Sequence, residues 1–410
     1  MILFEDALKT VLSQAGEIKY FVSRDGGERV ALSDSIGRIL AEDIFSDMDM
    51  PPFDKSAVDG YACRMPVVGV VGGVGAQNFV PLLVVKVIET IPAGKTPEKT
   101  IEPNECSKIM TGAMVPKGAD CIVMIEDTEV AGDNVIRITR DQKAKNICYR
   151  AEDIRSGDLV LEKGLKISPA HIAVMAGVGA INPLVAKLPR VGIISTGDEL
   201  VEPSLTPGIA QIRNSNGWQL EAQVKSVPAL PFYLGIAPDE GPELRNMIGL
   251  ALANHDVVLL TGGVSMGDFD NVPEILQEAG VEILFKKIAI QPGKPTVFGR
   301  KGDTFIFGLP GNPVSSYVLF EIMVKPFLRR MMGNEEPPVE LIVPMGIDFS
   351  RRKPDRKSMI PVIIRNGEVF PIEYHGSAHI NAYTKANAIL IMEIGTTAIH
   401  KGELVHVRPI

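Results

Sequence analysis

The segment PPFDKSAVDGYA, residues 51–62, places acidic, basic and hydroxyl side chains close together in the chain. Two adjacent prolines stop a helix and bias the backbone toward extended forms. The pair Asp59-Gly60 is typical of a tight turn with positive φ at the glycine. We therefore predict a stiff, ordered loop that is neither helix nor strand; an ordinary turn with solvated charges is the alternative. The side chains that such a loop would hold in place are Asp54, Lys55, Ser56 and Asp59.

The segment TGGVSMGDFD, residues 261–270, combines glycines with two aspartates. Glycines let backbone N–H groups approach a ligand and form an anion-binding nest. A helix predicted to begin near Val272 would add partial positive charge at its N-terminus. Phosphate is the natural guest, and because Asp268 and Asp270 would repel it, we expect a bridging Mg²⁺. A polar turn capped by an aspartate is the alternative.

Two further segments are predicted at the same edge of a sheet. STGDEL, residues 195–200, would bring Asp198 and Glu199 beside the two aspartates above. Clustered carboxylates are costly without a cation, although some of them could instead point into solvent. GLPGNP, residues 308–313, reads as a rigid loop with exposed backbone donors before a helix opened by Asn312. By itself it would be a structural helix start, but as a third loop on this edge it favours a binding site.

Two basic segments could supply the positive charge that an anion needs in an acidic protein, with solvated surface charges as the alternative. No nucleophile signature of the type G-x-S-x-G or H-E-x-x-H occurs. We therefore expect metal-assisted transfer at a phosphate rather than covalent catalysis. The basic side chains are Lys286, Lys287 and Lys294 in KKIAIQPGKP, and Arg351, Arg352, Lys353, Arg356 and Lys357 in RRKPDRK.

Alternating strands and helices would position these loops. Continuous apolar strands that alternate with helices predict a parallel α/β sheet covered on both faces. Ligands bind at the carboxyl ends of the strands in such sheets. The apolar runs are RVGIISTGDEL, HDVVLLTGGVSMGDFD, VEILFKKIAI and DTFIFGLPGNP; the predicted helices are NGWQLEAQVKSV, VPEILQEAG and a long helix that Asn312 and Pro313 open and Pro326 kinks.

The flanking regions predict β modules. Short β-rich runs between turns fill the region from about Ser46 to Cys148 and predict a small all-β module. Helical spacing over residues 4–12 predicts an amphipathic N-terminal helix, and SPAHIAVMAGVG, residues 168–179, has the start and stop signals of another. We expect these two helices to pack together, which would make the β module an insertion. After the linker NEEPPVE, short strands predict a terminal β domain.

Composition narrows the class of protein. The chain has 410 residues, enough for two to four domains, and a formal net charge of −8, which argues against a nucleic-acid partner. Its four cysteines form no C-x-x-C pair, so neither a zinc site nor a disulfide scaffold is expected. The acidic N-terminus is unlike a signal peptide, and the apolar stretch 67–85 is too interrupted to span a membrane. We expect a soluble, cytoplasmic protein without a membrane partner.

Seven segments in order resemble the motifs of the MoeA family, the molybdopterin molybdenumtransferases related to the E domain of gephyrin. The resemblance covers essentially the whole chain, and seven motifs at compatible spacing are highly specific. The segments are PPFDKSAVDGYA, KIMTGAMVPKGAD, RAEDIRSGD, STGDEL, TGGVSMGDFD, QPGKP and GLPGNPVSS.

The resemblance implies a multidomain α/β plus β fold in an elongated homodimer. The implied domains are a composite N-terminal domain (1–45 and 148–178), an inserted β domain (46–147), a MogA-like three-layer α/β domain that binds molybdopterin (179–331) and a C-terminal β barrel (332–410). The loop at residues 51–62 would form one wall of the active site and face the α/β domain of the partner chain.

The resemblance also implies a reaction. Molybdate is inserted at the dithiolene sulfurs of adenylylated molybdopterin, the pyrophosphate bond is cleaved, and AMP and molybdenum cofactor are released. The implied cofactor is Mg²⁺, and a molybdopterin adenylyltransferase is a candidate partner. Two alternatives stay open: a non-catalytic molybdopterin-binding scaffold, and a MogA-type adenylyltransferase acting on molybdopterin and ATP, against which the β domains argue.

Site residues are carried over from the family motifs position by position. Gln291 stands where the family often has lysine, which removes one candidate ligand of the oxyanion. The implied catalytic residues are Asp59, Glu199, Asp239 and Asp270, of which the last three would bind the metal. The implied substrate-binding residues are Thr111, Asp153, Gly262, Gly263, Ser265, Lys287, Lys294, Pro310, Gly311, Pro313, Arg356 and Ser377.

Overall fold

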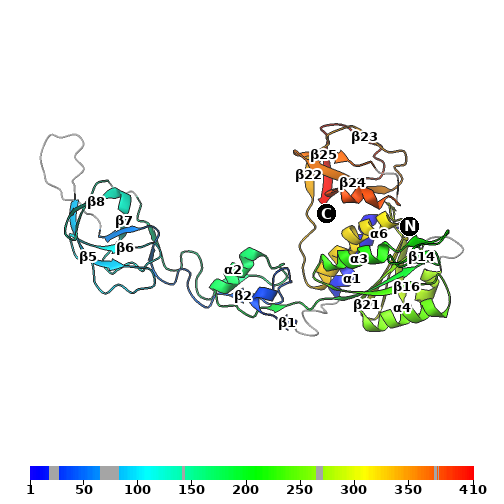
Figure 1. Cartoon of the computed structure of the whole chain (residues 1–410), viewed down its shortest axis with the longest axis horizontal. Coiled ribbons are helices and arrows are strands. Elements are labelled where there is room, and N and C mark those ends of the chain that lie inside the picture. Colours follow the sequence, from blue (N-terminus) through cyan, green and yellow to red (C-terminus); the bar gives the residue numbers. More distant parts are fainter. Residues whose placement is uncertain (18–26, 65–82, 141–143, 265–270, 374–375, 377) are drawn as a thin grey trace. The chain divides into compact units, whose positions relative to one another are not determined.

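A mixed six-stranded sheet forms the centre of the α/β part of the chain (Figure 1). The computed structural model describes residues 1–17, 27–64, 83–140, 144–264, 271–373, 376 and 378–410. Along the sheet the strands are β16 (Leu230–Ala237), β13 (Arg190–Thr196), β17 (Val257–Thr261), β21 (Thr304–Leu309), β20 (Pro295–Lys301) and β18 (Glu282–Lys287).

The first four of these strands are parallel, as predicted, but the prediction of a wholly parallel sheet is wrong at β20. Strand β20 pairs antiparallel with both of its neighbours, β18 and β21. Only Gly302 and Asp303 separate β20 from β21, and Gly302 has φ +57°. Such a short turn makes a hairpin, which is necessarily antiparallel.

Helices cover both faces of this sheet in three layers (Figure 1). Since the strands are buried on both faces, the continuous apolar runs of the sequence are explained. One face packs against α1 (Phe4–Glu17), α3 (Asn216–Lys225), α6 (Pro313–Leu319) and α7 (Lys325–Met331). The other packs against α4 (Pro242–Asn254) and α5 (Val272–Glu278).

Helix α1 confirms the predicted N-terminal helix but belongs to the α/β core. Phe4, Ala7 and Val11 are buried in the same cluster as Phe327 of α7. The prediction that α1 packs against the helix near residue 170 is therefore wrong: aromatic rings of β20, β21 and α7, such as Phe298 and Phe327, build a large apolar surface that covers α1 instead.

The predicted long helix runs from Pro313 to Met331 with a π-helical segment, η4 (Phe320–Val324), between α6 and α7. Pro326 lies in the first turn of α7. Because proline lacks an N–H and its ring collides with the preceding turn, the wider π turn accommodates it without ending the helix.

The terminal module is a barrel-like β domain, as predicted. Its sheet has the order β19-β24-β26-β28-β22, and β25 also pairs with β24. A bridge from Met345 to Val369 joins the end after β22 back to β25 and closes the sheet. The strands are β19 (Ile290–Gln291), β22 (Leu341–Pro344), β24 (Lys357–Arg365), β25 (Glu368–Pro371), β26 (Ala388–Met392) and β28 (Leu404–Pro409), with the pair β23 (Phe349–Ser350) and β27 (Ala398–Ile399) and the short helix η5 (Ile380–Thr384).

The predicted all-β module is confirmed as a second six-stranded sheet with its own core. All four cysteines are free thiols. In sheet order the strands are β7 (Cys121–Met124), β4 (Gly60–Cys63), β6 (Glu105–Ile109), β5 (Leu83–Ile91), β9 (Val135–Ile138) and β8 (Thr128–Gly132). Smaller elements are β2 (Ile44–Phe45) with β11 (Leu159–Leu161), β3 (Lys55–Ser56) with β10 (Ile147–Cys148), and η3 (Ile125–Asp127).

The prediction that residues 51–62 contain no strand is wrong, because β3 and the start of β4 lie within them. Gly60 does not have the predicted positive φ, since it is an extended residue of β4. A Cβ at this position would lie 2.0 Å from the carbonyl oxygen of Val123 on β7. The glycine is therefore needed for close approach of two strands and not for a turn.

By its internal contacts the chain divides into two compact units. The first comprises Met1–Glu42, Lys163–Ile172 and Asn182–Ile410, and the second comprises Asp43–Glu162 and Ala173–Ile181. The boundaries of the four expected domains stay predictions. The remaining elements are α2 (Pro169–Gly177), which begins and ends as predicted, β1 (Glu28–Arg29) with β12 (Leu184–Val185), β14 (Leu200–Val201) with β15 (Ile212–Arg213), and η2 (Leu32–Asp34).

Candidate active site

A cavity of about 560 Å³ lies at the carboxyl ends of β13, β17 and β21. The three segments predicted to share one edge, STGDEL, TGGVSMGDFD and GLPGNP, all contribute to it, so their predicted convergence is confirmed for the described residues. Its lining includes seven of the predicted site residues: Glu199, Asp239, Gly262, Gly263, Pro310, Gly311 and Pro313.

Carboxylates line one side of this cavity. Glu199 follows β13 and Asp239 follows the neighbouring strand β16. The carboxylates of Asp198 and Asp239 each accept a hydrogen bond from the other residue's N–H, at 3.4 Å. Gly197 has φ +152°, and a Cβ there would lie 2.5 Å from Oε2 of Glu199. The absence of a side chain at Gly197 therefore leaves room for the Glu199 carboxylate.

These oxygen ligands are of the kind that Mg²⁺ prefers. Among the residues that the structure describes, no three acidic, histidine or cysteine side chains are grouped closely enough to hold a metal ion. Glu199 and Asp239 are two of the three predicted ligands. The third, Asp270, lies outside the described residues, as does its neighbour Asp268.

Gly262 and Gly263 of the segment TGGVSMGDFD are required because neighbouring atoms leave no room for a side chain. Gly262 and Gly263 have φ of +101° and +60°, and a Cβ on Gly262 would lie 2.3 Å from the carbonyl oxygen of Thr196. The predicted nest lacks one donor, however, because the N–H of Gly262 donates to the carbonyl oxygen of Leu309 at 3.1 Å. Gly262 therefore shapes the cavity, and its own N–H is already engaged within the protein.

Two asparagines that the sequence analysis did not select hold this cavity together. Nδ2 of Asn216, at the start of α3, donates to Oγ1 of Thr261 at 2.9 Å and to the carbonyl oxygen of Gly311 at 2.7 Å. Oδ1 of Asn214 accepts from Oγ of Ser195 at 3.1 Å. The signal for both was the polar run RNSN, whose last residue begins the predicted helix NGWQLEAQVKSV.

The basic residues lie in the same compact unit. Lys287 pairs in register with Pro295, which lines the cavity. Arg356 reaches the QPGKP segment, where its Nη2 lies 3.5 Å from Oε1 of Gln291. A lysine at position 291 would bring a second positive charge to this guanidinium, whereas glutamine offers it an acceptor. Lys294, in the same segment, is exposed.

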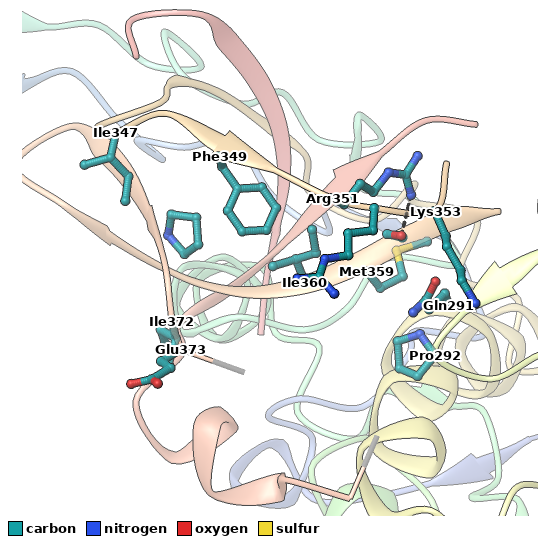
Figure 2. A pocket seen from close by; sticks show the side chains of 13 residues that line it. Gln291, Pro292, Ile347, Phe349, Arg351, Lys353, Met359, Ile360, Ile372 and Glu373 are labelled. Atoms are coloured by element: carbon teal, nitrogen blue, oxygen red, sulfur yellow. Dashed lines mark hydrogen bonds between the residues drawn. The ribbon is translucent and has the colours of Figure 1, made fainter. Parts of the chain in front are cut away.

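A second cavity, of about 640 Å³, lies against the terminal β domain (Figure 2). Gln291, Lys353 and Met359 are among the residues that line it. Arg351 also lines it, but its guanidinium donates to the carbonyl oxygens of Thr396 and Arg356, at 2.7 Å and 2.8 Å. Arg351 therefore ties the RRKPDRK segment to the loop at Thr396.

Asp59 and Thr111 form a polar pair in the second unit. Oδ1 of Asp59 accepts from the backbone N–H of Thr111 at 2.7 Å and from its Oγ1 at 2.8 Å. These hydrogen bonds, the backbone one first, hold the pKa of the Asp59 carboxyl below its ordinary value. Asp59 is therefore a carboxylate at neutral pH, suited to bind a cation or orient a donor and unsuited to donate a proton.

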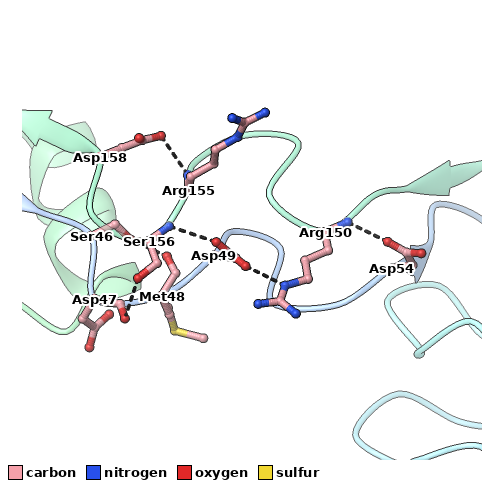
Figure 3. A network of polar contacts seen from close by, with 9 residues as sticks. All are labelled: Ser46, Asp47, Met48, Asp49, Asp54, Arg150, Arg155, Ser156 and Asp158. Atoms are coloured by element: carbon pink, nitrogen blue, oxygen red, sulfur yellow. Dashed lines mark hydrogen bonds and ion pairs between the residues drawn. The ribbon is translucent and has the colours of Figure 1, made fainter.

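Two other aspartates clamp the segment that carries Asp153 (Figure 3). Asp54 accepts from the N–H of Arg150 at 2.7 Å, and Asp49 accepts from Nε of Arg150 at 2.5 Å and from the N–H of Ser156 at 2.9 Å. The N–H of Asp153 donates to the carbonyl oxygen of Met50 at 3.0 Å. The prediction that the segment at residues 51–62 holds Asp54 in place is confirmed by its bond to Arg150.

The structure thus divides the predicted site residues into groups. The α/β cavity and the basic residues belong to the first unit, and Asp59, Thr111 and Asp153 belong to the second. Their common participation in one site stays a prediction. Ser265, Asp270 and Ser377 lie outside the described residues.

An α/β domain with a glycine-lined, acidic cavity at its strand ends, accompanied by two β modules, defines a class of multidomain α/β protein. Three family models match the chain: the MoeA N-terminal region (domains I and II) over residues 2–179, a probable molybdopterin binding domain over 192–330, and the MoeA C-terminal region (domain IV) over 344–410.

Relatives of known name match this chain over nearly its full length. The chain is 35% identical to the molybdopterin molybdenumtransferase of Staphylococcus epidermidis, covering 99% of this chain and 95% of that one, and 35% identical to that of Bacillus subtilis, covering 95% and 91%. The crystal structure of a molybdopterin biosynthesis MoeA protein from Pyrococcus horikoshii matches with a TM-score of 0.84 and 29% identity over the whole of both chains. The chain therefore belongs to the MoeA family. Within the described residues, no helix has the length and apolar character to cross a membrane.

Proposed function

We propose that this chain is a molybdopterin molybdenumtransferase, which inserts molybdate into adenylylated molybdopterin and releases AMP. The observation that carries the proposal is the cavity at the strand ends, which Glu199 and Asp239 line together with Gly262 and Gly311. Carboxylates in the same cavity as loops shaped by glycines fit a diphosphate that is held through a cation.

In this proposal the chain's own residues bind and orient the substrates. Glu199, Asp239 and Asp270 would hold Mg²⁺, which supplies charge neutralisation at the diphosphate when bound. The backbone at Pro310 and Gly311 would shape the wall against which the diphosphate lies. Ser265, Lys287, Lys294, Pro313, Arg356 and Ser377 would bind the oxyanion and the pterin phosphate.

We also propose a homodimer in which Asp59, Thr111 and Asp153 of one chain complete the cavity of the other. The ionised Asp59 carboxylate supports a role in orienting the reacting end of the substrate. A molybdopterin adenylyltransferase is the proposed source of the adenylylated substrate. Mg²⁺, the dimer, this partner and the cytoplasmic location remain predictions.

The test is AMP release from adenylylated molybdopterin with Mg²⁺, with and without molybdate. We expect molybdate-dependent AMP release in the wild-type protein and its loss in Asp59→Asn. Because the Asp59 side chain is exposed and its hydrogen bonds within the described residues go to Thr111, its substitution should change turnover far more than stability. A melting temperature that falls with normal turnover per folded molecule would contradict the proposed role.

Two results would point to other functions. Tight nucleotide binding without AMP release under any metal condition would favour a molybdopterin-binding scaffold. Consumption of ATP with molybdopterin as co-substrate would favour a MogA-type adenylyltransferase.

A further inference from the structure

The cavity against the terminal β domain lies at a gap in the pairing of β24 (Figure 2). On the edge of β24 opposite to β26, β19 pairs with Lys357 and Ser358, and β25 pairs with residues 362–365. In the described part of the chain, no strand pairs with residues 359–361 on this edge. Pro361 suits such a place, because proline has no N–H to offer a neighbouring strand. The wall of the domain is therefore open between β19 and β25, where the cavity lies.

Apolar side chains form most of the lining of this cavity. Met359 and Ile360 of β24 are buried, and Ile347 and Phe349 line the cavity from the segment that leads into β23. Ligand sites are mostly apolar cavities with a few polar groups, and the mouth of a β-barrel is a frequent place for them. The volume of about 640 Å³ is of the size that such a site requires.

The polar part of the lining carries positive charge. Arg352 and Lys353 line the cavity and are exposed, and neither forms an ion pair within the described residues. Lys353 lies beside Gln291 at one end of the cavity, whereas Glu373 lies at the opposite end (Figure 2). In a chain with a net charge of −8, this end is a local site of attraction for an anion.

The proposed function leaves Arg352 and Lys353 without a role. Of the basic segment RRKPDRK, Arg356 is a predicted substrate ligand and Arg351 holds the segment in place. None of the residues that line the α/β cavity, and none of the residues predicted to bind the substrate or metal, lines this second cavity. Its ligand is therefore independent of the proposed reaction.

We propose that this cavity binds a small amphiphilic anion, namely an apolar ring system or chain that carries one carboxylate, phosphate or sulfonate group. The apolar body packs against Phe349, Met359 and Ile360. The anionic group lies at the end that Lys353 occupies. Glu373 at the other end repels a second anionic group, so the ligand has one orientation and a single charged end.

The experiment compares two fluorescent probes that differ in charge. One is 8-anilinonaphthalene-1-sulfonate, and the other is N-phenyl-1-naphthylamine, which has the same rings and no sulfonate. Both should bind saturably to the folded protein. In the double variant Arg352→Gln/Lys353→Gln, we expect a roughly tenfold weaker affinity for the sulfonate and an unchanged affinity for the amine. Both cations are replaced because each exposed ion pair contributes little.

A second pair of variants tests where the probes bind. Ile347 lines the cavity and is 46% exposed, whereas Ile342 on β22 is 61% exposed and does not line it. Ile347→Asp should weaken the binding of both probes at least tenfold, because it places a charge in the apolar lining. Ile342→Asp is the matched control and should bind both probes as wild type does. Lys401→Gln, at an exposed lysine of the same domain, is the control for charge.

The inference is overturned if wild type binds neither probe, or if Ile347→Asp binds the sulfonate as tightly as wild type does. An equal loss of affinity for both probes in the double variant also overturns it, because the two cations would then act on the structure and not on the anion. If wild type binds no probe and Ile347→Asp dissociates a dimer in light scattering, a second copy of the chain covers the cavity. None of these measurements depends on AMP release.

Discussion

Single side chains decide what the polar groups of this chain can do. Asp59 was selected from a loop with an Asp-Gly pair, but its chemistry comes from Thr111, which is remote in sequence and donates twice to one oxygen. Two donors on a carboxylate favour its ionised form. Asp59 is thus prepared to remain charged at any physiological pH.

Thr111→Val should raise the pKa of Asp59 toward its ordinary value, because the hydroxyl donor is lost while the backbone N–H remains. The measurement is the pH dependence of the Asp59 carboxyl carbon shift in NMR spectra of both proteins. An unchanged midpoint would mean that the backbone N–H alone lowers the pKa.

The sign of the effect on stability follows from the same shift. A carboxyl group whose pKa is lowered by folding stabilises the folded state above its unfolded pKa, and this contribution disappears as pH falls through the folded value. In Thr111→Val the loss should therefore begin at higher pH. Acid unfolding followed by circular dichroism checks this expectation.

At the scale of elements, close approach of strands explains residues that local patterns misassign. The pair Asp59-Gly60 matches a turn, yet Gly60 lies in β4 between β6 and β7. Turn preference reports only the energies of the local backbone, whereas here the backbone of β7 leaves no room for a Cβ. Tertiary contact therefore overrides the turn signal.

Gly60→Ala should destabilise the sheet that contains β4 by roughly 1–3 kcal/mol, as expected for overpacking. Hydrogen exchange should show the loss of protection in β4, β6 and β7. Gly132→Ala is the control, since a Cβ at this residue of β8 meets no atom closer than 4.0 Å. Equal protection in both variants would refute the close-contact explanation.

At the scale of the whole molecule, Lys357 joins the two ends of the first unit. It is 8% exposed and forms ion pairs with Glu5 of α1 and, at 2.8 Å, with Glu393 of the terminal β domain. Burial lowers the pKa of Lys357, but the hydrogen bonds to Glu393 and Glu5 outweigh burial, so the pKa lies above its ordinary value. This side chain thus connects elements from opposite ends of the sequence.

Lys357→Met should reduce the free energy of unfolding by about 1–3 kcal/mol at neutral pH, because both charge-assisted hydrogen bonds are lost. Since folding raises the pKa of Lys357, its contribution is complete below the unfolded pKa and is lost as pH rises through the folded value. Thermal melts of both proteins from pH 7 to pH 11 should therefore differ by a constant amount below the unfolded pKa of lysine, about 10.4, and the difference should begin to narrow above it.

The control for this prediction is Lys225→Met on α3. Lys225 pairs with Glu221 one helical turn away at the surface, where such pairs contribute little. A constant difference between wild type and Lys357→Met across the pH range would show that lost packing of the lysine stem, and not its charge, is responsible.

Much of the architecture could be predicted because hydrophobic periodicity and helix-capping residues within short segments indicate it. Apolar runs such as Val257–Thr261 are buried on both faces of a sheet, and a helix such as α2 carries its own start and stop residues. The three loops of the cavity could be predicted together because parallel strands end at one edge. The family motifs assign Glu199 and Asp239 to the site, and both residues line the cavity at the strand ends.

The sequence by itself determined the order of the β module, the α/β sheet and the terminal β module, the strands and helices with strong periodicity, and the family. Only the tertiary structure decided that α1 packs on α7, that β20 runs antiparallel, and that a cavity lies where the pairing of β24 is interrupted between β19 and β25. The physical reason is the range of the interactions. Periodicity, capping and turn preference act within a few residues, whereas a hydrogen-bond partner, a close strand or a covering helix comes from a distant part of the chain.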